Sequence, residues 1–182
     1  MASTSAMPRY IEIAVNLGDP MFQGEYHGKK KHEEMDSYEG GPQAYVSRLQ
    51  QYIQEHDRIV AVGECGLEVQ KRGFELQLQM ATKVRLPLFL HSRAAHKDFV
   101  AILKPYLDEL RPTKDHVDAG SPGSVGVVHS FTGTVEELHE LVDLGLYIGV
   151  NGCSLKAQEN LDVVKQIPLH RILLETGMFT CF

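Results

Sequence analysis

Three short apolar segments of the chain each lead directly into a residue whose side chain can bind a metal ion. The segments and the residues that follow them are 59–63 with Glu64, 86–90 with His91, and 125–128 with His129. Unbroken apolar runs are typical of parallel strands buried on both faces, and functional groups of α/β folds gather where such strands end. The pattern therefore predicts parallel strands that end at one carboxylate and two imidazoles.

The two histidines admit a structural interpretation beside the functional one. A histidine next to an apolar run is more often a hydrogen-bonded structural residue than a metal ligand. Three such residues in one chain, with the ligand types of a divalent-metal site, favour the functional interpretation.

Strands and helices alternate along the chain. Apolar runs indicate six strands, near residues 10, 59, 87, 125, 147 and 172, and helices are expected over 45–57, 74–85, 94–110, 134–142 and 159–166. Pro105 predicts a kink or an early stop in the third helix, and Thr134 with Glu137 has capping-box spacing at the start of the fourth. The alternation implies parallel strands joined by right-handed crossovers. Residues 111–124 are expected to form a surface loop.

Length and composition limit the class of protein. The 182 residues, of which 43% are hydrophobic and 23% charged, suit a single globular domain with a substantial core. The formal net charge of -6 argues against a broadly basic surface that coats nucleic acid. It does not exclude a nuclease, because bound metal ions can supply local positive charge.

Cysteine usage and the absence of apolar spans indicate an intracellular protein. Cys65, Cys153 and Cys181 are scattered and form no CxxC pair, which is typical of a reducing compartment. No secretory signal and no stretch long enough to cross a membrane is recognisable. We expect the nucleus or the cytoplasm as the location and no membrane partner.

Several segments, in order, resemble the TatD family of metal-dependent deoxyribonucleases, and most closely its eukaryotic branch. They read IEIAVNLGDPMFQGEYHGKKKH, VAVGECGL, LPLFLHSR, GVVHSFTGT, LYIGVNGCSLK and RILLET, and they run through nearly the whole chain. The resemblance implies a TIM-type (β/α) barrel of the metal-dependent hydrolase kind. It also implies that Glu64, His91 and His129 bind one or two divalent ions, and that DNA is the substrate of an exonucleolytic phosphodiester hydrolysis. The mixed nitrogen and oxygen donor set favours Mg, Mn or Zn.

The chain departs from the family pattern at two places. The stretch between about residues 36 and 42 is too short to hold the second and third strands, which leaves about six of the eight strands of such a barrel. After Glu175 and Thr176, Gly177 occupies the position at which the family has a ligand Asp. We therefore expect residues 1–182 to form one TatD-like domain that is incomplete internally and at the C-terminus, as in a truncated or alternatively spliced isoform.

Three further residues are candidates for substrate or auxiliary roles. Asn16 stands at the end of the first-strand motif, Arg93 could face a phosphate or form a surface ion pair, and Glu175 could partly replace the missing aspartate. No residue is assigned a catalytic role. Because a lost ligand weakens metal binding, we expect weak or absent nuclease activity. The alternative is a non-catalytic isoform or fragment that acts through protein contacts with unspecified partners.

Overall fold

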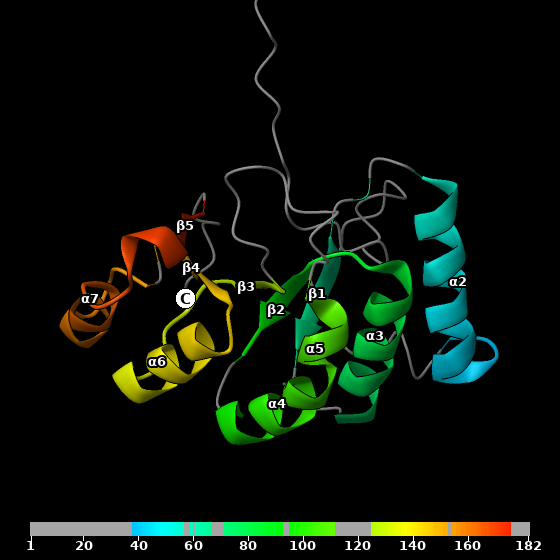
Figure 1. Ribbon diagram of the computed structural model, residues 1–182, viewed down its shortest axis with the longest axis horizontal. Helices are drawn as coiled ribbons and strands as arrows, with labels where there is room; N and C mark the ends of the chain where they lie inside the picture. Colours follow the sequence, from blue (N-terminus) through cyan, green and yellow to red (C-terminus); the bar gives the residue numbers. More distant parts are fainter. Residues whose placement is uncertain are drawn as a thin grey trace, which may run out of the picture.

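The computed structural model describes residues 38–56, 59, 61–66, 71–92, 95–111, 125–152 and 154–175 (Figure 1). Within them the chain forms a five-stranded sheet in the order β1-β2-β3-β4-β5, and every neighbouring pair is parallel. The strands are β1 Val62–Gly66, β2 Leu88–His91, β3 Gly126–Val128, β4 Tyr147–Val150 and β5 Ile172–Leu174. Consecutive parallel strands that are adjacent in space are the repeating unit of an α/β barrel. The described sheet is therefore an arc of such a barrel.

Helices connect the strands and follow the outside of the sheet (Figure 1). They are α2 Gly41–Glu55, α3 Lys71–Val84, α4 His96–Leu103, η2 Lys104–Tyr106, α5 Leu107–Leu110, α6 Val135–Asp143, α7 Gln158–Val164 and η4 Leu169–Arg171. None of the described helices is long and apolar enough to cross a membrane.

The core lies between the sheet and the helices that cover it. Buried side chains of α3, α4 and α6 pack against the apolar residues of the strands, and Phe74 stacks on Phe99 with ring centroids 5.2 Å apart. Leu138 of α6 is 0% exposed. The apolar runs in the sequence thus correspond to strands that are covered by helices, as a parallel sheet requires.

The structure confirms several features expected from the sequence. Pro105 ends the regular α-helical turn, because α4 stops at Leu103 and a 3₁₀ turn precedes α5. The capping box is formed: the Thr134 side chain accepts from the Glu137 backbone N–H at 3.3 Å, and the Glu137 carboxylate accepts from the Thr134 N–H at 3.0 Å. The strand expected near residue 10 and the loop expected over 111–124, apart from Arg111, lie outside the described residues.

The strand near residue 59 requires a correction. The sequence predicts that it ends before Glu64, whereas β1 begins at Val62 and continues through Glu64 to Gly66. The reason is the pairing with β2. Val62 pairs with Leu88 and Cys65 with Leu90, so three steps along β1 match two along β2 and the register shifts between them. Glu64 lies in this irregularity, of the kind that redirects side chains next to functional sites.

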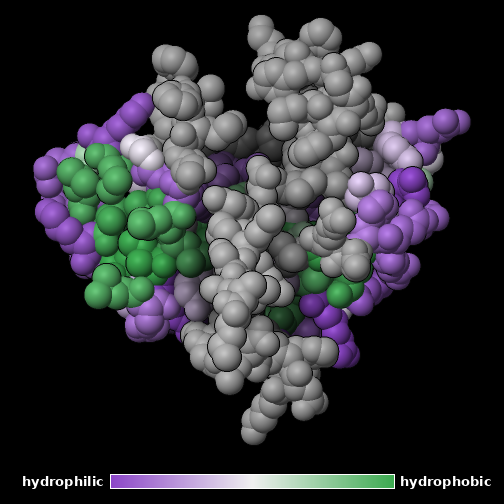
Figure 2. Space-filling model, turned by 90° about the horizontal axis from the view of Figure 1, so that it is seen from above, coloured by the Kyte–Doolittle hydropathy of each residue, from purple (hydrophilic) through white to green (hydrophobic). Residues whose placement is uncertain are grey.

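Two edges of the sheet, at β1 and at β5, have no further strand among the described residues. Two leucine side chains at and just before β5 are exposed: Leu169 is 91% and Leu174 is 83% exposed. Figure 2 shows a hydrophobic area on the side of the molecule that carries α7 and β5. An exposed apolar strand edge is a surface to which another chain can pair.

Substitution of Leu138 tests the packing of α6 on the sheet. We expect Leu138→Ala to lower the free energy of unfolding by about 2–5 kcal/mol, because it opens a cavity at a fully buried site. Leu169→Ala, at an exposed site, is the matched control and should change stability by less than about 0.5 kcal/mol. Urea unfolding followed by circular dichroism measures both. Equal effects of the two substitutions would contradict this description of the core.

Candidate metal centre

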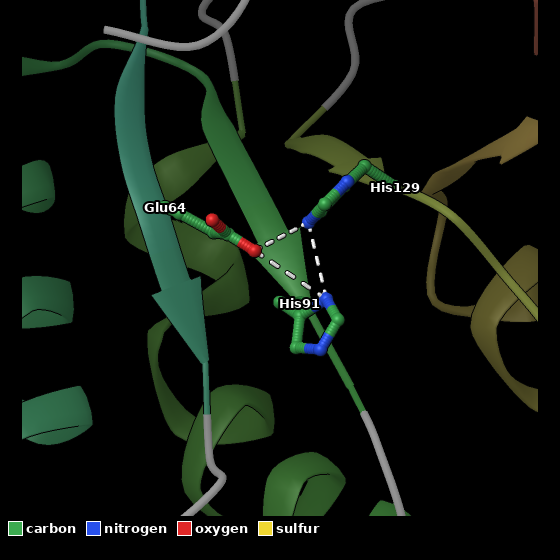
Figure 3. Close-up of side chains that lie close together, drawn as sticks. All are labelled: Glu64, His91 and His129. Carbon is green, nitrogen blue, oxygen red and sulfur yellow. Dashed lines mark hydrogen bonds and ion pairs between the residues drawn. The ribbon is translucent and has the colours of Figure 1, made fainter. Parts of the chain in front are cut away.

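Three side chains from neighbouring strands meet near the carboxyl ends of the sheet: Glu64 lies within β1, His91 ends β2 and His129 follows β3 (Figure 3). Glu64 Oε1 lies 2.6 Å from His129 Nε2 and 3.4 Å from His91 Nδ1, and the two imidazole nitrogens are 3.1 Å apart. One donor atom from each residue therefore lies within 4.8 Å of the others. The structure brings together the three residues that the sequence singled out.

Backbone contacts between the strands fix these positions. His91 is the last residue of β2 and pairs with Gly66, while the N–H of His129 donates to the Leu90 carbonyl at 2.9 Å. A Cβ at residue 66 would collide with the His91 carbonyl oxygen, so glycine at this position permits the close approach of β1 and β2. The ring of Phe89 stacks on His129 with centroids 4.4 Å apart.

The donor set suits a divalent cation. Ligand atoms about 2.1 Å from a shared metal ion, at tetrahedral or octahedral angles, lie roughly 3.0–3.4 Å from one another. The separations of 2.6, 3.1 and 3.4 Å come close to these values. The side chains are 42% (Glu64), 24% (His91) and 15% (His129) exposed, so the group can be reached from solvent. A carboxylate with two imidazoles favours Mg, Mn or Zn.

Cys65 lies beside Glu64 but does not belong to the donor set. Its side chain is fully buried, and its Sγ lies 3.6 Å from the Val62 carbonyl oxygen. Burial, and secondly the negative charge of Glu64, raise the pKa of this thiol to about 12. Cys65 therefore stays protonated at neutral pH, and the thiolate that a soft metal prefers is not supplied.

A second group of polar side chains lies on the far side of His129. Ser130 and Asn151 stand with Glu175 at the ends of β3, β4 and β5, and the Ser130 hydroxyl is 3.0 Å from His129 Nδ1. The Glu175 carboxylate binds Ser130 and Asn151 and is not one of the three metal-capable residues. Sequence reasoning missed Ser130 and Asn151, although both stand just beyond strand ends. Asn16, Arg93 and Gly177 lie outside the described residues.

A pocket of about 520 Å³ opens beside the cluster. It is lined in part by Ser92, which follows His91, and by Phe131 and Thr132 of the loop that follows His129. His96 of α4 and residues of α6 and α7, among them Glu136, Glu137 and Glu159, complete the wall. No sequence pattern predicted this pocket, because its wall combines residues that are distant along the chain.

Comparison with known proteins agrees with this architecture. A solved structure of an uncharacterised amidohydrolase from Saccharomyces cerevisiae matches with a TM-score of 0.62 and 35% identity, over 80% of this chain and 49% of that one. Deoxyribonuclease Tat-D of Schizosaccharomyces pombe is 36% identical over 239 aligned positions, which cover 95% of this chain and 73% of the relative. These positions outnumber the 182 residues of this chain, so the alignment contains gaps here.

A bacterial relative and the family model give the same assignment. The 3'-5' ssDNA/RNA exonuclease TatD of Citrobacter koseri is 38% identical over 130 residues, 65% of this chain and 45% of the relative. The chain thus spans less than half the length of this relative and of the yeast structure. The family model described as TatD related DNase matches residues 26–178. This match, together with the parallel sheet and its Glu-His-His cluster, shows that the chain belongs to the TatD-related DNase family.

Proposed function

We propose that this chain binds a divalent cation through Glu64, His91 and His129 and hydrolyses phosphodiester bonds of DNA. The observation that carries the proposal is the convergence of three donor atoms, from β1, from β2 and from the residue that follows β3, within 4.8 Å of one another. The printed names of the relatives, a deoxyribonuclease and a 3'-5' ssDNA/RNA exonuclease, support a nucleic-acid substrate and attack at a chain end.

The charge of the site explains why a cation is needed. The protein carries a formal net charge of -6, and Glu64 adds a carboxylate where the phosphate must approach. Two like charges 4 Å apart repel by about 4 kcal/mol at an effective dielectric constant of 20. A bound divalent ion removes this repulsion, stabilises charge on the phosphoryl oxygens and lowers the pKa of an attacking water.

The residues of this chain have distinct parts in such a reaction. Glu64 supplies the oxygen donor, and the two histidines supply neutral nitrogen donors. The neighbouring pocket of about 520 Å³ falls in the usual size range of small-ligand sites, and its carboxylates Glu136, Glu137 and Glu159 would repel a phosphate there. Because Gly177 stands where the family has an aspartate, the chain lacks that carboxylate, and we expect slower hydrolysis than in a family member that has it.

The second candidate function is a non-catalytic isoform that acts through protein contacts. Its support is the sheet edge at β5, where Leu169 and Leu174 are 91% and 83% exposed. The alignment with the fission yeast relative has 239 positions, more than the 182 residues of this chain, so the relative has segments that this chain lacks. These gaps support the proposed absence of internal strands. The two candidates differ in whether metal binding is accompanied by turnover.

Thermal melting with added metal tests the cation site. We expect Mn²⁺ at about 100 times its dissociation constant to stabilise the protein by about 2.7 kcal/mol, because the ion binds the folded state selectively. Glu64→Gln should abolish this increase in melting temperature, since the amide is a weaker, uncharged donor.

Glu109→Gln makes the same chemical change at an exposed position of α5 and serves as the control. This variant should keep the full metal-induced increase in melting temperature. A wild-type protein that melts cooperatively but gains nothing from Mn²⁺, Mg²⁺ or Zn²⁺ would refute the cation site.

Degradation of labelled single-stranded DNA tests the nuclease activity. We expect metal-dependent shortening of the DNA strand from its end. The cleavage rate should fall at least about 100-fold in His129→Ala, because loss of a ligand should cost more than the 10–100-fold typical of the loss of a ligand's hydrogen-bond partner. Gel electrophoresis of timed samples measures the rate. Metal binding without any cleavage would favour the non-catalytic candidate, and equal cleavage by His129→Ala would mean that another enzyme is responsible.

A further inference from the structure

The side of His129 that faces away from Glu64 is held by a connected set of hydrogen bonds. The Ser130 hydroxyl lies at its centre, 3.0 Å from His129 Nδ1, 3.3 Å from Glu175 Oε2 and 2.5 Å from Asn151 Nδ2. Backbone bonds fix the strand ends that carry these residues, since the Glu175 N–H donates to the Val150 carbonyl at 2.9 Å. Backbone hydrogen bonds of the sheet therefore hold these residues in place.

The Glu175 carboxylate is the anchor of this set. Both of its oxygens accept from the Ser130 backbone N–H at 3.2 Å, and Oε2 lies 3.4 Å from Asn151 Nδ2. Its side chain is 19% exposed. A Cβ at Gly149 would collide with Glu175 Oε1, so the glycine leaves the space that the carboxylate occupies. Ser130 has φ 51°, a left-handed conformation that a non-glycine residue rarely adopts, and the bonds to Glu175 hold it there.

The direction of each hydrogen bond follows from the chemistry of the groups. A carboxylate only accepts, so Asn151 Nδ2 and the Ser130 hydroxyl both donate toward Glu175. The Ser130 hydroxyl has a single proton, which it gives to Glu175, and it accepts from Asn151 Nδ2 with one lone pair. Its other lone pair faces His129 Nδ1 and can only accept. The Ser130 hydroxyl therefore pairs with a protonated Nδ1. This leaves Nε2, which lies 2.6 Å from Glu64 Oε1, as the nitrogen that would bind a cation in place of its contact with the carboxylate.

We propose that Glu175, acting through Ser130 and supported by Asn151, is a positioning residue that keeps the proton of His129 on Nδ1 and directs Nε2 toward the cation. This inference rests on the proposed cation site. It assigns to Glu175 a role behind the histidine in place of a role as a ligand. Hydrogen-bond partners of metal-binding histidines fix the tautomer and orientation of the ring, and their loss typically costs 10–100-fold in metal affinity.

Two substitutions separate positioning from folding. In Glu175→Gln the amide nitrogen can donate to Ser130, which reverses the chain of hydrogen bonds so that the serine donates to Nδ1. Ser130→Gly removes the hydroxyl but retains the backbone N–H that binds Glu175, and glycine adopts a positive φ without strain. Both variants should fold, and both should lose the proton on Nδ1. Glu109→Gln, exposed on α5, is the control.

The experiment combines nitrogen-15 NMR of the His129 imidazole in the metal-free protein with calorimetric titration by Mn²⁺. We expect a protonated Nδ1 in the wild type and in Glu109→Gln, an unprotonated Nδ1 in both other variants, and about 10-fold weaker Mn²⁺ binding in those two. An unchanged Nδ1 signal together with unchanged affinity would overturn the inference. If the wild type bound no Mn²⁺, the proposed function would fail, and the NMR result would still decide the role of Glu175.

Discussion

Parallel pairing of strands in chain order is the constraint on which the rest of this structure depends. Neighbouring strands lie about 4.8 Å apart, and β1 to β5 all run in the same direction. Side chains at the ends of adjacent strands consequently come within reach of one another without a long loop between them. Glu64 within β1, His91 at the end of β2 and His129 just after β3 come from three consecutive strands, and their donor atoms lie within 4.8 Å of one another.

The strands β4 and β5 contribute no side chain to the Glu-His-His cluster, but the residues that follow them determine the orientation of His129. Glu175 follows β5 and Asn151 follows β4, and both bind Ser130 next to His129. The imidazole therefore has two differently organised sides, with Nε2 toward Glu64 and Nδ1 toward the serine.

The positions of the strands and the start of α6 were predictable, because they depend on short stretches of sequence. Apolar runs located five described strands, and the Thr134 and Glu137 spacing located the start of α6. The irregular pairing around Glu64 depends on how β1 meets β2, which no single segment encodes. Likewise, the bond between Ser130 and Glu175 joins residues 45 positions apart. The three residues of the Glu-His-His cluster were therefore predictable from the sequence, and the hydrogen bonds behind His129 were not.

Anomalous X-ray diffraction from crystals that contain Mn²⁺ tests the central claim most directly, because it locates the ion without assumptions about activity. We expect one or two peaks beside the cluster, with an ion bonded to a Glu64 oxygen, His91 Nδ1 and His129 Nε2 at about 2.0–2.2 Å, and with Glu175 outside bonding distance. An ion bound at other residues, or none at this cluster at saturating Mn²⁺, would contradict it.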